Sequence, residues 1–140
     1  MEHAQYERIR ESFRTLAPRG AEVFAAFVNR LNGTPVLRAM FPAQPEDHAQ
    51  AFLAPCGLIV KNLHRLSAIE YLLHETGAKN QARGVLPQHY GAARDALLAT
   101  LAEALGEQWT EELAEDWSQA VDVVISVFIR GAGRARSKAA

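Results

Sequence analysis

The chain has 140 residues, of which 49% are apolar and 22% charged, and its formal net charge at pH 7 is −1. This length suits one domain with a continuous core, and the near-neutral charge excludes a general basic field for nucleic acid. The single cysteine, Cys56, excludes an internal disulfide and favours a reducing compartment. The first residues mix charged and apolar side chains, unlike a signal peptide or a membrane span, so we expect a cytoplasmic protein.

Apolar residues in the first part of the chain recur every three or four positions, which is the spacing of amphipathic helices. A first helix is predicted over residues 6–16 and ends at Pro18. A second begins after Gly20 and ends near Asn32, and a short helical turn covers residues 35–40. The segment therefore predicts two amphipathic helices and a connecting turn.

A third long helix is predicted to begin at Pro45, where a proline and two acids suit a first helical turn. Its apolar stripe is continuous and consists of Phe52, Cys56, Ile59, Val60 and Leu63. Pro55 lies inside this stripe, and a proline in a helix interior costs roughly 3 kcal/mol. We therefore expect a kink within residues 51–55.

The second half of the chain predicts three more helices. Ser67 and Glu70 have the spacing of a capping box and start a helix that weakens at Gly77. The next helix covers residues 87–105, and Thr110 is placed to cap the last one. That last helix is apolar nearly all round over residues 123–129, so it should lie at the centre of the fold.

No segment alternates with period two over the length of a strand, so the sequence predicts an all-α fold of one domain, residues 1–132. Its helices leave two arrangements open, an irregular packing or a plainer bundle. Residues 133–140 are small and basic and predict a flexible tail. That tail is either a solvated, fraying end or an arm that binds anions.

Four segments, in this order and spacing, resemble single-domain bacterial haemoglobins and the globin part of flavohaemoglobins. They read FVNRL at residues 27–31, LRAMF at 37–41, PQHY at 87–90 and LGEQWTEE at 105–112. The colinear match extends from about Ile9 to Ile129. The resemblance implies a globin-like packing of six to eight helices, a haem cofactor, and a diatomic gas such as O2 or NO as ligand.

Several positions of the family's distal pocket are changed in this chain. By resemblance, Phe41 matches the phenylalanine that stacks on the haem face, and His48 falls where the family has a distal glutamine or histidine. Phe52 stands one turn later, where a leucine or valine is usual, and Val28 replaces the distal tyrosine or bulky apolar residue. For Phe41 and Phe52 ordinary core packing is the alternative role.

On the proximal side, Val85 and Tyr90 match residues that pack under the porphyrin. The family's iron ligand is a histidine ten residues before that tyrosine, and this position is Asn80. A carboxamide is a poor iron ligand. The glutamate that accompanies the ligand in flavohaemoglobins aligns with Arg134.

His48 is the one histidine whose aligned position faces the iron, so it is the candidate metal ligand; otherwise it is a partly exposed residue of a first helical turn. Two functions stay open. One is haem-linked binding of O2 or NO, with ligation through His48 or a weakly held haem. The other is a haem-free sensor or interaction module, whose partner is a second copy or another protein. We expect no enzyme, because no residues are spaced for nucleophilic or acid–base catalysis.

Overall fold

The computed structural model describes residues 1–139, with side chains described to residue 135, and this part of the chain contains helices and no strand. The all-α prediction is therefore confirmed. The long helices are α1 (His3–Leu16), α2 (Gly20–Asn29), α4 (Ala49–Lys61), α5 (Glu70–Ala82), α6 (His89–Leu105) and α7 (Glu111–Ala139). The short α3 (Pro35–Arg38) and 3-10 turns at Ala17–Arg19, Pro45–His48, Leu63–Ile69 and Gly106–Gln108 complete the fold.

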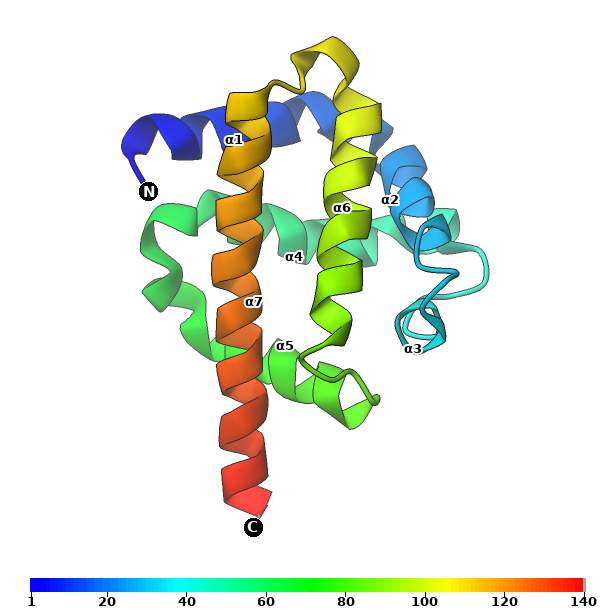
Figure 1. Ribbon diagram of the computed structural model, residues 1–140, viewed down its shortest axis with the longest axis vertical. Coiled ribbons are helices and arrows are strands. Elements are labelled where there is room, and N and C mark those ends of the chain that lie inside the picture. Colours follow the sequence, from blue (N-terminus) through cyan, green and yellow to red (C-terminus); the bar gives the residue numbers. More distant parts are fainter. Residues whose placement is uncertain (140) are drawn as a thin grey trace.

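The helices form two crossing layers (Figure 1). Helices α6 and α7 stand side by side, while α1, α4 and α5 run across behind them and α2 and α3 close one side. One apolar cluster lies where α1 and α4 meet the upper parts of α6 and α7, and contains Ile9, Leu16, Val60, Leu63, Leu101, Leu105, Leu113, Trp117 and Ala120. A second cluster joins α2 and α4 to the corner between α5 and α6. This irregular crossing excludes the plain bundle, one of the two arrangements that the sequence left open.

The predicted start of α7 is confirmed, whereas α4 begins at Ala49, after a 3-10 turn over Pro45–His48, and not at Pro45 as predicted. The Thr110 hydroxyl accepts a hydrogen bond from the Leu113 N–H at 3.1 Å, which confirms the predicted cap of α7. Helix α4 continues through Pro55. The capping box predicted at Ser67 is wrong, because Ser67 lies in a 3-10 turn and α5 begins at Glu70 without a side-chain cap. The preceding chain turns sharply at a non-helical residue, Arg65, which delays the start of the α-helix.

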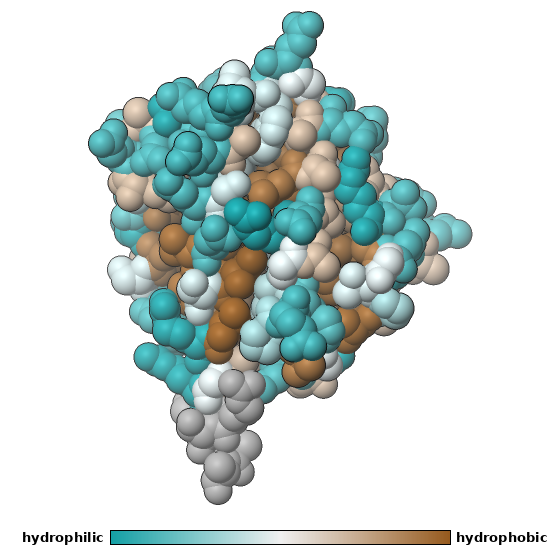
Figure 2. Space-filling model, in the orientation of Figure 1, coloured by the Kyte–Doolittle hydropathy of each residue, from teal (hydrophilic) through white to brown (hydrophobic). Residues whose placement is uncertain are grey.

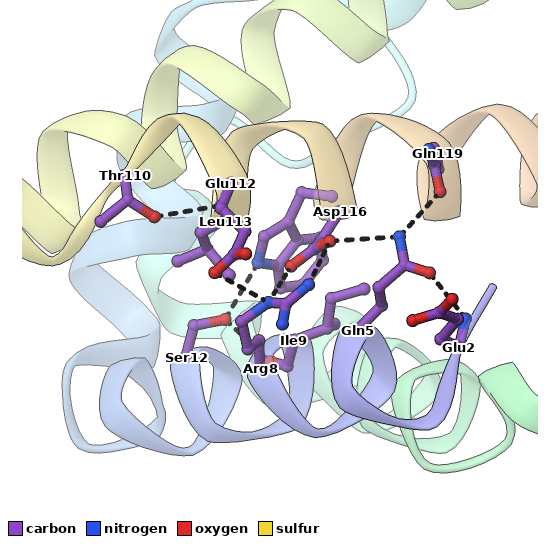
Figure 3. Close-up of polar contacts among 11 residues, drawn as sticks. Glu2, Gln5, Arg8, Ile9, Ser12, Thr110, Glu112, Leu113, Asp116 and Gln119 are labelled. Atoms are coloured by element: carbon purple, nitrogen blue, oxygen red, sulfur yellow. Dashed lines mark hydrogen bonds and ion pairs between the residues drawn. The ribbon is translucent and has the colours of Figure 1, made fainter.

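Helix α1 is fastened to α7 by a buried polar cluster (Figure 3). The Asp116 carboxylate is buried and accepts two hydrogen bonds from Arg8, at 2.6 Å from Nε and 3.1 Å from a terminal nitrogen. One turn after Arg8 on α1, the Ser12 hydroxyl accepts a hydrogen bond at 2.9 Å from the indole N–H of Trp117, the residue that follows Asp116. Because the buried carboxylate and the buried indole are both satisfied, the first and last helices are held in one register.

The surface carries charged residues with an apolar band between them on the face of α6 and α7 (Figure 2). Within residues 1–139, none of the helices combines the length and apolar character needed to cross a lipid bilayer. Helix α7 runs without a break into the segment predicted as a tail and reaches Ala139. The flexibility of residues 133–140 stays a prediction, and Ala140 lies outside the described residues.

Candidate functional site

The end of α5 places Asn80 at the corner that leads into α6. Gly84 adopts φ +96°, a left-handed conformation that suits glycine, and its N–H donates to the Gln81 carbonyl at 2.9 Å. The Val85 N–H donates to the Asn80 carbonyl at 3.1 Å. These two bonds form a Schellman motif that reverses the chain and buries Val85 immediately after the helix.

Asn80 and Tyr90 form a direct contact across this corner. The Asn80 side-chain N–H donates a hydrogen bond to the Tyr90 hydroxyl oxygen at 3.2 Å. Burial raises the pKa of Tyr90 above its ordinary value, while the hydrogen bond from Asn80 acts in the opposite direction. His89, beside it, accepts a hydrogen bond from the Leu86 N–H at 2.8 Å and so closes the start of α6.

Two of the residues expected on the distal side, Phe41 and Phe52, lie in a cluster of four phenylalanine rings with Phe24 and Phe27. The rings of Phe24 and Phe52 stack with centroids 4.6 Å apart. Phe41 stands edge-on to both, at 5.7 Å from each, and also edge-on to Phe27 at 6.0 Å. Such stacked and edge-to-face pairs are favourable beyond the area they bury. Phe41 and Phe52 therefore pack against each other and against the two phenylalanine rings of α2.

One apolar cluster joins this distal group to the proximal corner. Val28, Val85 and Tyr90 belong to the same buried cluster as Phe24 and Phe27, and Phe41 and Phe52 pack against it. The Tyr90 ring also lies 6.0 Å from the Phe128 ring of α7. The structure thus brings six of the seven predicted site residues together, at an apolar cluster formed by side chains of α2, α4, α6 and α7 among others.

His48, the seventh predicted residue, lies on the surface at the end of the 3-10 turn Pro45–His48, directly before α4. His74 instead lies on α5 between Glu70 and Arg134, with Nε2 3.4 Å from the Glu70 carboxylate and Nδ1 3.3 Å from the Arg134 guanidinium. Arg134, predicted to align beside the ligand, thus contacts His74. Among residues 1–139, no three His, Cys, Asp or Glu side chains are grouped to hold a metal ion.

The residues at this site do not fit a haem held in the usual way. The apolar lining suits a porphyrin, but Asn80, at the position that the resemblance assigns to the iron ligand, has an amide whose N–H donates to the Tyr90 hydroxyl. A surface hollow beside α3 is lined by Phe41 but not by Asn80, Val85 or Tyr90, and a second hollow, between α1 and α4, is lined by none of the predicted site residues. The four rings meet each other at the distances of direct packing.

The contribution of Phe24 and Phe27 to this site was not predicted from the sequence. Their spacing placed them on the apolar face of a helix, which is the pattern of any core residue. Nothing in that pattern distinguishes rings that fill a ligand slot from rings that pack two helices. The sequence carried no net signal about the volume of the slot, because Phe52 in place of a smaller aliphatic residue adds bulk while Val28 in place of a tyrosine removes it.

Comparison with known proteins gives the family from sequence and the fold from structure. The sequence model of the family described as Globin matches residues 21–128. A neuroglobin of Tetraodon nigroviridis is 31% identical over 85 residues, which cover 61% of this chain and 54% of that protein. A flavohemoprotein of Bordetella pertussis is 29% identical over 114 residues, which cover 79% of this chain but 28% of that protein.

A bacterial globin from Campylobacter jejuni has the same fold, with a TM-score of 0.83 and 17% identity over 97% of this chain and 99% of that one. The chain spans about half the length of the neuroglobin and a smaller part of the flavohemoprotein. Members of this family generally bind haem and, through it, diatomic gases. Because the family model covers most of the residues, the chain belongs to the globin family.

Proposed function

We propose that this chain is a haem-free globin, a sensor or interaction domain whose fold is held by side chains where relatives hold a cofactor. The observation that carries the proposal is the hydrogen bond from Asn80 to Tyr90 at 3.2 Å. In this bond the side chain of Asn80, which the resemblance places at the position of the iron ligand, donates to the hydroxyl of Tyr90. The partner is then a protein, either a second copy of the chain or another one.

The chemistry of the site supports this proposal from both sides. A carboxamide is a neutral, weak donor to iron, whereas the ligands used on a haem axis are imidazole, thiolate, thioether and phenolate. On the opposite side, the Phe24 and Phe52 rings stack at 4.6 Å. A porphyrin inserted between Phe52 and Tyr90 would have to separate an apolar cluster that packs without it.

The second candidate is haem-linked binding of O2 or NO, which membership of the globin family favours. Phe41, Val85 and Tyr90 lie at one apolar cluster, as the resemblance requires for walls of a haem slot. His48 would have to supply the iron ligand from the distal side. Its exposed position before α4 means that the chain there must fold inward before an imidazole can reach the cluster.

Haemin titration of the purified protein separates the two candidates. The wild type is expected to show no Soret band and no rise in melting temperature, since a ligand that binds the native state must stabilise it. Asn80→His restores imidazole at the corner and is expected to gain both. Asn80→Gln, which keeps a carboxamide, is the matched control and should behave as the wild type.

A Soret band in the wild type would overturn the haem-free proposal. If His48→Ala then removed that band while leaving the melting temperature of the apoprotein unchanged, ligation through His48 would be established instead. The two variants report on opposite sides of the cluster, so their outcomes are independent.

A further inference from the structure

Helices α5 and α7 cross at a point where their backbones touch, and two glycines make the contact. A Cβ atom built at Gly77 would lie 2.7 Å from the Phe128 Cα and closer still to the Phe128 carbonyl oxygen. A Cβ atom at Gly131 would lie 2.7 Å from the His74 carbonyl carbon and closer to the His74 Cα. Any side chain at either position would therefore force the helices apart.

The contact is reciprocal. Gly77 of α5 meets Phe128 of α7, and Gly131 of α7 meets His74 of α5, three residues away on each helix. The two contacts pair residues 74 and 77 of α5 with residues 131 and 128 of α7, so each helix contributes one glycine and one larger residue to the crossing. Both glycines are buried, and α7 is the main packing partner of α5.

Helix α5 has a sequence that favours the helical state only weakly. Its interior includes Thr76, Gly77 and Asn80, which are poor helix formers, and glycine alone costs about 1 kcal/mol relative to alanine. Its only fully buried residues are Leu73 and Gly77. A helix with so little apolar surface of its own takes its stability from tertiary contacts.

The same crossing is tied to the candidate site. Phe128, whose backbone meets Gly77, places its ring 6.0 Å from the Tyr90 ring. Tyr90 in turn accepts the hydrogen bond of Asn80, one turn beyond Gly77 on α5. Helix α5 thus contacts its neighbours at two points one turn apart: Gly77 packs against the backbone of α7, and Asn80 bonds to the Tyr90 hydroxyl of α6.

We propose that the Gly77–Gly131 crossing is a latch that holds α5 in place in the absence of any iron–ligand bond. The inference deepens the proposed function and rests on it, since a haem-free globin needs another means of fixing the helix that carries the ligand position. The latch fixes α5 through close backbone packing, so it is intolerant of any side chain. Loss of this contact would let α5 and the Asn80 corner unfold locally while α1, α4, α6 and α7 stay folded.

Amide hydrogen exchange of the full chain without added haem tests the latch. In the wild type, amides of residues 73–82 should exchange at rates within about tenfold of those in the centre of α7, because both helices open together. Gly77→Ala should accelerate exchange in residues 73–82 by about tenfold or more, while exchange in α1 and α4 is unchanged. Gly91→Ala is the matched control, because Gly91 is also helical and nothing lies within 4 Å of its Cβ position.

Free exchange of residues 73–82 in the wild type would overturn the latch, and this measurement needs no variant to fold. So would a Gly77→Ala protein in which α5 keeps its protection, or in which all helices lose protection to the same extent. The haem-free proposal fails separately, through a Soret band in the wild type. A chain that binds haem yet protects α5 before haem is added would retain the latch and lose the proposed function.

Discussion

The side-chain N–H of Asn80 donates a hydrogen bond to the hydroxyl of Tyr90 at 3.2 Å, across the corner between α5 and α6. The two residues stand ten positions apart, and the Schellman motif at Gly84 brings them together. In the family that the chain resembles, the first of these positions carries the iron ligand. Here it carries a group that supports the fold by bonding to a phenol.

A double-mutant cycle on this pair should measure a favourable coupling. We expect Asn80→Leu and Tyr90→Phe to be coupled by about 0.5–1.5 kcal/mol, the usual net contribution of one hydrogen bond. Urea unfolding of the wild type, the two single variants and the double variant gives the value. Additive effects of the two substitutions would mean that the contact contributes nothing to stability.

The same pair predicts how stability changes at alkaline pH. Burial raises the pKa of Tyr90 in the folded state above the value of about 10 in the unfolded chain. Its contribution is therefore complete below pH 10 and is lost as the pH rises through the folded pKa. The stability advantage of the wild type over Tyr90→Phe, measured by urea unfolding, should shrink above pH 10. An advantage that stays constant to pH 12 would contradict this linkage.

The phenylalanine cluster should behave as packed core. Phe24 is buried and stacks on Phe52, so Phe24→Ala should lower the free energy of unfolding by about 3–5 kcal/mol. Tyr71→Ala is the control, because that ring is 75% exposed, and it should change stability by less than about 0.5 kcal/mol. If Phe24→Ala were as mild as the control, the rings would line an open slot and leave room for a cofactor.

The contact between α1 and α7 predicts a further effect on stability. Ser12→Ala removes the acceptor of the Trp117 indole N–H, which stays buried, and should cost about 1–3 kcal/mol. Ser126→Ala is the matched control, because Ser126 is an exposed serine of α7 whose hydroxyl bonds to its own helix at 3.0 Å. Thermal unfolding followed by tryptophan fluorescence measures both. Equal effects of the two substitutions would show that the indole N–H finds another acceptor.

Local signals in the sequence predicted the order of the helices and several of their ends. The cap at Thr110 was predictable because a threonine side chain can accept a hydrogen bond from the first turn of the helix that follows it. The PQHY segment marks the start of α6, because a proline is tolerated at the beginning of a helix but not in its interior. The start of α5 was misplaced at Ser67. A capping box is a pattern of two side chains, and the 3-10 turn that overrides it is set by how the chain leaves α4.

Long-range contacts were not predictable from a single chain. Gly77 was expected to weaken its helix, whereas in the fold it permits the backbone contact with Phe128. The burial of Asp116 gave no signal either, because one carboxylate in a helix with many acids resembles a solvated one until Arg8 is seen beside it. Of the site, the sequence predicted a corner between two helices with Asn80 ten residues before Tyr90, but neither their hydrogen bond nor the packing of Phe24 and Phe27 against Phe41 was predicted.

An absorption spectrum of the protein as isolated, from cells supplied with haem, distinguishes a haem-free globin from a haem-binding one. We expect a tryptophan and tyrosine band without a Soret band, because a carboxamide at Asn80 is a poor iron ligand and the rings of Phe24 and Phe52 stack on each other. A Soret band corresponding to one haem per chain, retained through gel filtration, would contradict it.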